Sequence, residues 1–72
     1  MREDVANSGP QLIKLREVMA LTSLSKATFY RLIARNSFPK QLHYSTRAMW
    51  VRDEVQEWIR ARIAERDRAM AA

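Results

Sequence analysis

The spacing of apolar residues changes twice along this 72-residue chain, and that change limits the folds it can adopt. Within residues 12–21 and again within 29–33, apolar side chains recur at the spacing of one face of an α-helix. Between residues 38 and 51 they alternate with polar ones, as in a half-buried β-strand. Helical spacing returns after residue 52. The chain therefore predicts two helices, a hairpin and a third helix, in that order.

Two short helices with a tight turn between them are predicted in the first half of the chain. The first covers about residues 15–21, and the second covers 26–35. Ser25 is the predicted N-cap of the second helix, because its hydroxyl can accept a hydrogen bond from a free N–H in the first turn. Asn36 and Pro39 mark the end of this helix, since proline disfavours helical angles in the residue before it. The inward sides of the two helices are predicted to consist of Leu12, Leu15, Val18, Met19 and Leu21, and of Phe29, Leu32 and Ile33.

A two-stranded hairpin and a longer helix are predicted in the second half. The β-favouring residues 42–44 and 49–51 flank a tip near residues 45–47. The last helix covers about residues 52–66 or slightly beyond, with acidic residues in its first turns and arginines toward its end, as the helix dipole favours. Its inward stripe is predicted to consist of Val55, Trp58, Ile59 and Ile63.

The expected organisation is a single domain with short extensions. Residues 1–11 mix charged residues with Asn-Ser-Gly-Pro and predict a flexible N-terminal arm. The domain covers residues 12–67, and residues 68–72 form a tail that we expect to fray. Such a short chain buries too little apolar surface for a second core.

Length and composition exclude several classes of function. A chain of 72 residues has no room for a deep active site, so we expect no enzyme. It has no cysteine, and its one histidine, His43, cannot form a metal centre alone, so we expect neither a metal nor a cofactor. No apolar run approaches the ~20 residues that span a bilayer, and no signal-peptide core is present. We therefore expect a cytoplasmic protein without a membrane partner.

The net charge of +5 arises entirely in the middle of the chain. Residues 18–52 contain six basic residues and no acidic one. The flanks nearly cancel, with three residues of each sign in 1–17 and four basic against five acidic residues in 53–72. A basic surface is often only a solvated face. An acid-free segment that also carries two adjoining helices favours a polyanionic partner.

The predicted order of elements is that of a small winged helix-turn-helix domain, so the expected fold is mainly α. In such a domain the second helix enters the major groove of DNA. With Phe29, Leu32 and Ile33 turned inward, the opposite side of that helix is basic and carries small side chains. Each cation taken alone could be an ordinary solvated side chain. The predicted DNA-binding residues of this helix are Lys26, Ala27, Thr28, Tyr30, Arg31 and Arg35.

The hairpin is predicted to be the wing that contacts phosphates or an adjacent minor groove. Arg47 is its strongest candidate, because it is permanently charged and lies at the expected tip. Trp50 and Trp58 could stack on bases, but Trp58 belongs to the apolar stripe of the last helix, so core packing is favoured. The predicted DNA-binding residues of the wing are Lys40, His43, Ser45, Thr46 and Arg47.

These segments resemble the AlpA family of small phage-type transcriptional regulators, close to the excisionase and MerR-like winged helix group. "LREV" followed by "LTSLSKATFYRLIARNSFPK" is similar to the family's first helix, Ser-x-x-Thr core and Phe-Pro step. A tryptophan then closes the hairpin before the acidic "DEVQEWI" helix. The resemblance covers about residues 12–67. Many members have glycine between the first helices and in the wing, where this chain has Ser23 and "YSTR".

The resemblance implies a sequence-specific regulator that binds double-stranded DNA in a prophage or integrative element and activates an integrase gene. An excisionase-like recombination directionality factor is the alternative within that class. A single small module makes few base contacts, so a homodimer, a cooperative array or DNA bending is expected, with integrase as a further candidate partner. The alternative from another class is a protein-interaction or anti-repressor module. A steep salt dependence of DNA affinity would separate the two.

Overall fold

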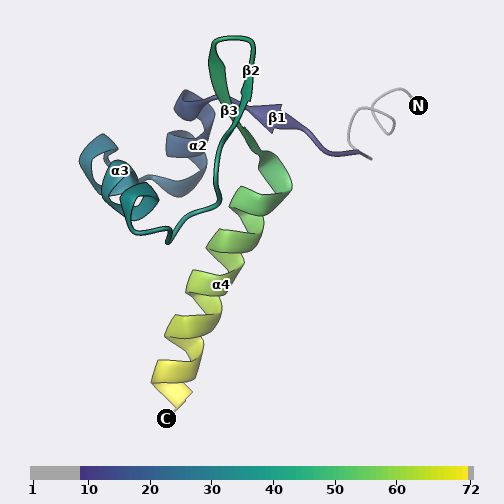
Figure 1. Ribbon diagram of the computed structural model, residues 1–72. Coiled ribbons are helices and arrows are strands. Elements are labelled where there is room, and N and C mark those ends of the chain that lie inside the picture. Colours follow the sequence, from purple (N-terminus) through teal and green to yellow (C-terminus); the bar gives the residue numbers. More distant parts are fainter. Residues whose placement is uncertain (1–8, 72) are drawn as a thin grey trace.

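A computed structural model describes residues 9–71 of the chain. In chain order, the described elements are β1 (Leu12–Ile13), α2 (Leu15–Thr22), α3 (Lys26–Ala34), β2 (Leu42–Tyr44), β3 (Arg47–Val51) and α4 (Arg52–Ala71). The predicted fold, a mainly helical winged helix-turn-helix, is confirmed (Figure 1). Most of the predicted N-terminal arm, residues 1–8, lies outside the described residues, as does residue 72.

The strand β1 is the main departure from the predicted elements. The helical spacing predicts that Leu12 faces inward, and this is wrong. Leu12 and Ile13 pair antiparallel with β3, opposite Val51 and Trp50 respectively. Because successive side chains of a strand point to opposite faces, Ile13 is buried while Leu12 is 47% exposed. The sheet therefore has three strands among the described residues, with β3 between β1 and β2.

The turn between α2 and α3 occupies residues 23–25 and is held by local hydrogen bonds. Ser23 has the left-handed φ of 61°, and its N–H donates to the carbonyl of Met19 at 2.7 Å. The hydroxyl of Thr22 donates to the carbonyl of Val18 at 2.9 Å. The bond from Ser23 completes the last turn of α2, and the bond from the Thr22 hydroxyl adds a second contact to that turn. The tight turn predicted from the sequence is confirmed.

The end of α3 is a Schellman motif. Asn36 has a left-handed φ of 59°, and its N–H donates to the carbonyl of Ile33 at 3.0 Å. The N–H of Ser37 donates to the carbonyl of Leu32 at 2.9 Å. Asparagine adopts the left-handed conformation more readily than most residues, so it ends the helix as predicted. The chain then leads directly to the buried Phe38.

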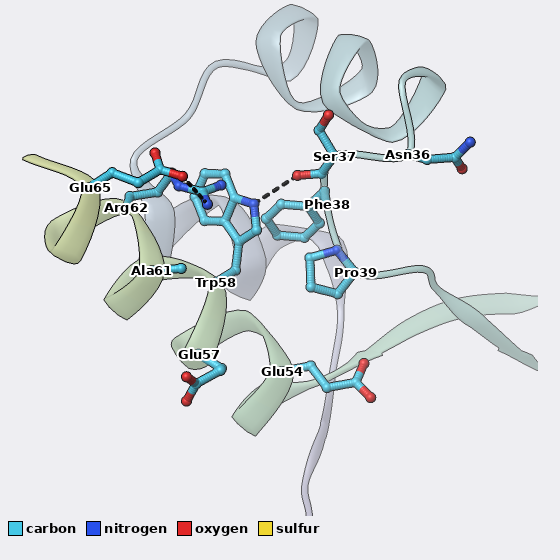
Figure 2. A pocket seen from close by; sticks show the side chains of 10 residues that line it. All are labelled: Asn36, Ser37, Phe38, Pro39, Glu54, Glu57, Trp58, Ala61, Arg62 and Glu65. Atoms are coloured by element: carbon cyan, nitrogen blue, oxygen red, sulfur yellow. Dashed lines mark hydrogen bonds and ion pairs between the residues drawn. The ribbon is translucent and has the colours of Figure 1, made fainter.

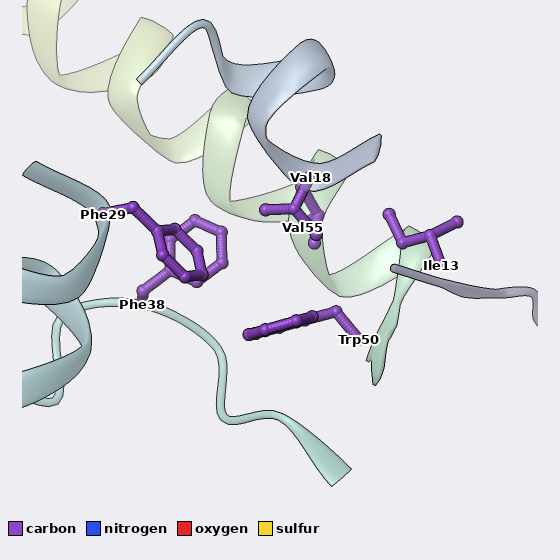
Figure 3. Packing of buried hydrophobic residues seen from close by; sticks show 6 residues of the cluster. All are labelled: Ile13, Val18, Phe29, Phe38, Trp50 and Val55. Atoms are coloured by element: carbon purple, nitrogen blue, oxygen red, sulfur yellow. The ribbon is translucent and has the colours of Figure 1, made fainter. Parts of the chain in front are cut away.

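The core lies where α2, α3, β3 and α4 meet. Phe29 of α3 is fully buried, and its ring contacts those of Phe38 and Trp50 edge to face, with centroids 5.2 and 5.4 Å apart. Leu32 and Ile33 are half-buried against this cluster, so the predicted inward side of α3 is confirmed. The buried residues, drawn in Figure 3, are Ile13, Val18, Phe29, Phe38, Trp50 and Val55.

The helix α4 is longer than the sequence predicts. It continues to Ala71 instead of ending near residue 66, and residues 68–71, which we expected to fray, are helical. Ion pairs one turn apart connect Arg60 with Glu57 at 3.1 Å and Arg62 with Glu65 at 2.9 Å. Such pairs stabilise an exposed helix. They support the part of α4 that projects away from the body in Figure 1.

The inward stripe of α4 is shorter than predicted. Ile63 is expected to face the core, and this is wrong, because its side chain is 45% exposed. Helical spacing identifies the side of a helix but not how far the rest of the domain covers it. Beyond Arg62 every described residue is exposed. Neither α4 nor any other helix in residues 9–71 is long and apolar enough to cross a membrane.

Candidate nucleic-acid interface

The N-terminus of α3 is capped by hydroxyl groups and carries no acidic side chain. The N–H of Thr28 donates to Ser25 Oγ at 3.2 Å, and that hydroxyl donates to Thr28 Oγ1 at 3.0 Å. The predicted cap is confirmed. The first turns of α2 and α4 contain acidic residues, whereas the first turn of α3 contains none. The partial positive charge at the start of α3 is therefore not neutralised by its own helix, which favours an approaching anion.

The outward side of α3 brings five of the six predicted residues to the surface. Lys26, Ala27, Tyr30, Arg31 and Arg35 are exposed. Tyr30 is 51% exposed, and the edge of its ring contacts Phe29 at a centroid distance of 5.3 Å, so its orientation is restrained by the core. Thr28 differs, because it is half-buried and its hydroxyl is already bonded to the cap. The helix thus offers one cation at its start and two toward its end, with Ala27 and Tyr30 between Lys26 and Arg31.

The hairpin of β2 and β3 projects from the body in Figure 1. His43 pairs with Ala48 across the strands, and Ser45 and Thr46 form the turn at the tip. Ser45 has a left-handed φ of 59°. Arg47, predicted at the tip, is the first residue of β3. All the predicted wing residues are exposed: Lys40, His43, Ser45, Thr46 and Arg47.

Tyr44 is a surface residue of the hairpin that sequence reasoning missed as a candidate. Its side chain is 73% exposed, and it pairs across the strands with Arg47. The alternation of Leu42 and Tyr44 predicts one buried face, but β2 is the outer strand of the hairpin, and only β3 is partly covered by the body. The whole of β2 is accordingly exposed. An aromatic ring beside an arginine is a combination that can contact a sugar-phosphate backbone or a base.

The cations of α3 and the hairpin are not neutralised within the described part of the chain. The ion pairs found in residues 9–71 all lie on α4: Glu57 with Arg60, Arg62 with Glu65, and Arg66 with Asp67. Lys26, Arg31, Arg35, Lys40 and Arg47 form no ion pair there. Their charge is available to an outside polyanion. In Figure 1, α3 and the hairpin both lie at the end of the molecule opposite the free C-terminal end of α4.

A second surface feature is an open groove of about 800 Å³ between the end of α3 and α4, shown in Figure 2. Trp58 forms its floor and donates from Nε1 to the carbonyl of Ser37 at 2.8 Å. The guanidinium of Arg62 lies 4.8 Å from the centroid of the Trp58 ring. Trp58 also packs against Phe38, at 5.0 Å between centroids. The preference for a packing role over base stacking is supported, because Trp58 fastens the end of α3 to α4.

Two adjoining helices with a basic outward face, a projecting hairpin and a closing helix define the class: this is a small winged helix-turn-helix protein. Residues 11–63 match the family described as "Prophage CP4-57 regulatory protein (AlpA)". The chain therefore belongs to the AlpA family of prophage regulatory proteins, and the predicted family is confirmed. It is 36% identical over 63 residues to the uncharacterized protein ORF88 of Enterobacteria phage P4. The matched stretch covers 86% of this chain and 72% of that protein. No solved structure matches the chain significantly.

Proposed function

We propose that this protein binds double-stranded DNA sequence-specifically and regulates transcription in a prophage or integrative element. The observation that carries the proposal is the basic outward face of α3, whose cations form no ion pair in residues 9–71 while its opposite face is anchored in the core by Phe29. A helix presented in this way can enter the major groove while the domain stays folded behind it. Membership of a family of prophage regulators supports the same function.

On this proposal, α3 supplies both base and phosphate contacts. Lys26 and Arg31 donate to guanine edges or phosphates, and Ala27 is small enough to contact a thymine methyl group. Tyr30 and Arg35 extend the phosphate contacts along the helix. The hydroxyl oxygen of Thr28 already accepts a hydrogen bond from Ser25, so Thr28 contacts DNA only through its remaining O–H donor, its second lone pair or its methyl group.

The hairpin contributes contacts to the backbone or the minor groove. Arg47 is the principal cation, since it can insert into a narrow minor groove where the negative potential is enhanced. Lys40, His43, Ser45 and Thr46 contact phosphates beside it. These contacts position the protein, whereas α3 reads the sequence.

The regulatory output is activation of an integrase gene, with an excisionase-like directionality factor as the alternative. Both outputs use the same DNA-binding surface, and the similarity to a phage protein suits both. They differ in where the protein binds, so footprinting on the surrounding mobile element separates them. Protection at an integrase promoter indicates activation, and protection beside an attachment site indicates excision.

The salt dependence of binding to duplex DNA tests the proposal. If several cations contact phosphates, log K falls linearly with log salt, with a slope of roughly −0.9 for each phosphate contacted. Fluorescence anisotropy with a labelled duplex at several salt concentrations measures this slope. A flat response, or no binding at low salt, would reject the proposal.

The groove of Figure 2 supports a second candidate, a protein-interaction or anti-repressor module. Its rim carries Glu54, Glu57 and Glu65 around an aromatic floor. On this reading the basic face of α3 is a solvated surface and the groove is where a partner binds. The same anisotropy measurement decides between the two, because the second candidate predicts no salt-dependent affinity for duplex DNA.

A further inference from the structure

The projecting half of α4 carries an apolar stripe that the described part of the domain leaves open. Ile63 is 45% exposed and Met70 is 77% exposed. Ile59, which is half-buried and packs partly against the core, continues the same row. The three residues are spaced by four and seven, so they lie on one side of the helix. An apolar stripe on a helix that no longer packs on its own domain is suited to another helix.

The same side of α4 also has a surface depression beside Ile59. A depression of about 180 Å³ is lined, among the described residues, by Gln56, Ile59 and Arg60. It lies 10 to 14 residues before Met70 on the same helix. With a rise of about 1.5 Å per residue, that is roughly 15 to 20 Å, which is too far for the helix's own Met70 to fill it.

We propose that two copies of this chain pair through α4, with the two helices antiparallel. In the register that places Met70 of each copy opposite Ile59 of the other, both depressions are filled by an exposed methionine. Methionine suits such a site because it is flexible and fills irregular gaps. The same register places Ile63 against the aliphatic stem of Arg66 of the second copy, whose charged end reaches the rim.

The charges of α4 are self-complementary in this register. Arg60 and Asp67 are seven residues apart, so both lie along the same edge of the apolar stripe. The antiparallel register brings Arg60 of each copy beside Asp67 of the other. These contacts extend the pairs that already exist within each helix, between Arg60 and Glu57 and between Arg66 and Asp67. A parallel arrangement would place the two Met70 side chains together, leave both depressions empty and lose this complementarity. Charge therefore selects the antiparallel pair.

The pairing itself does not depend on DNA, but the role given to the dimer in binding two DNA half-sites rests on the proposed function. A closed antiparallel pair has two-fold symmetry, so it presents two α3 helices to two half-sites of a palindrome. The hairpin and the free half of α4 project in different directions in Figure 1, so pairing leaves the wing accessible. The apolar stripe is short, and the dimer is accordingly weak in free solution and strengthened on adjacent sites of one DNA molecule.

Sedimentation equilibrium of the full chain without DNA tests the pairing. We expect a concentration-dependent dimer, and Ile63→Glu with Met70→Glu should weaken it at least tenfold because a charge then replaces each apolar contact. Both positions are exposed, so circular dichroism should report an unchanged fold. A chain that is still monomeric at about 1 mM, or a dimer that this double variant leaves intact, overturns the inference.

Charge reversal tests the antiparallel register. Arg60→Glu and Asp67→Arg should each weaken the dimer roughly threefold to tenfold, since two equivalent pairs are reversed at once, and combining them should restore it. The matched control is Arg68→Glu, which changes the net charge as Arg60→Glu does but lies away from the stripe. Equal effects of Arg60→Glu and Arg68→Glu, or no restoration in the combined variant, would overturn the register.

A variant weakened in DNA binding separates this inference from the proposed function. Arg31→Ala lies on α3, far along the chain from the pairing surface, and should dimerise as the parent does. If the parent chain dimerises but shows no salt-dependent DNA affinity, the proposed function fails and the pairing stands. If it binds DNA but stays monomeric, with no second copy recruited on a two-site duplex, the pairing fails alone.

Discussion

The two arginine-bearing regions of this molecule use their charges in opposite ways. On α3 and the hairpin, Arg31 and Arg47 stand among cations with no acidic neighbour in the chain and no ion pair among residues 9–71. On α4, Arg60, Arg62 and Arg66 each pair with a carboxylate of the same helix. Of these, the exposed pairs one turn apart, Arg60 with Glu57 and Arg62 with Glu65, stabilise the helix by only a few tenths of a kcal/mol each. The unpaired cations of α3 and the hairpin gain no such stabilisation from an ion pair. Unpaired surface cations are expected where their partner is another molecule.

The sharpest contrast lies within α3, between its buried and exposed sides. Phe29→Ala should lower the free energy of unfolding by about 3–5 kcal/mol, because it removes the ring that contacts Phe38 and Trp50 at the centre of the core. Chemical denaturation measures this loss. The adjacent Tyr30→Ala is the matched control and should cost about 1 kcal/mol or less, since half of that side chain is exposed. Equal losses would mean that α3 is rotated about its axis from the orientation described.

Substituting one arginine in each region compares the two regions directly. Arg31→Ala on α3 should weaken DNA binding by about 1–3 kcal/mol if it contacts a base, or lower the salt slope by about one if it contacts a phosphate. Arg60→Ala on α4 removes the same side chain from a paired position and should leave affinity for a single site nearly unchanged. Anisotropy titrations of both variants provide the comparison. Equal losses would show that general positive charge, rather than the face of α3, attracts the DNA.

Trp58 of α4 bonds to Ser37 and packs on Phe38, just after α3, and so links the two regions. Trp58→Phe keeps an aromatic ring in the groove but removes the Nε1 donor to the carbonyl of Ser37, so the unfolding free energy should fall by about 1 kcal/mol. Ser37→Ala is the control, because it retains the accepting carbonyl and should melt as the parent does. Thermal melting at one salt concentration checks both. If Trp58→Phe melts unchanged, the hydrogen bond does not fasten the end of α3 to α4.

Elements that local chemistry specifies can be predicted from the sequence, whereas elements that depend on distant parts of the chain cannot. The Ser25 cap and the Asn36 helix end were predictable, because each is determined by the residue and its immediate neighbours. The strand β1 was not, since a strand of two residues is too short to show alternation and exists only through its pairing with β3. Ile63 has the right spacing to face inward, but spacing does not show where the domain surface ends. The exposure of Tyr44 was missed for the same reason.

The smallest expected effects concern the two serines that adopt a left-handed conformation, Ser23 in the turn before α3 and Ser45 at the tip of the hairpin. A residue with a side chain is strained by about 1 kcal/mol in this conformation, whereas glycine is not, although glycine loses more backbone entropy on folding. Both Ser23→Gly and Ser45→Gly should therefore raise the unfolding free energy by about 0.5 kcal/mol.

Ser37→Gly is the control for this comparison. Ser37 has no positive φ, so glycine there should lower stability by a similar amount. Denaturation of all three variants checks the signs, and a stability loss in Ser23→Gly or Ser45→Gly would contradict the assigned conformation.

DNA affinity then separates the two serines. Ser23 lies between the helices, so Ser23→Gly should bind DNA as the parent does. Ser45 lies at the wing tip, so Ser45→Gly should bind more weakly by up to about 1 kcal/mol if its hydroxyl contacts a phosphate, even though the domain is more stable. Higher stability with unchanged affinity would remove Ser45 from the DNA contacts and leave Arg47 as the cation that the wing presents. The serine would then serve only to turn the chain.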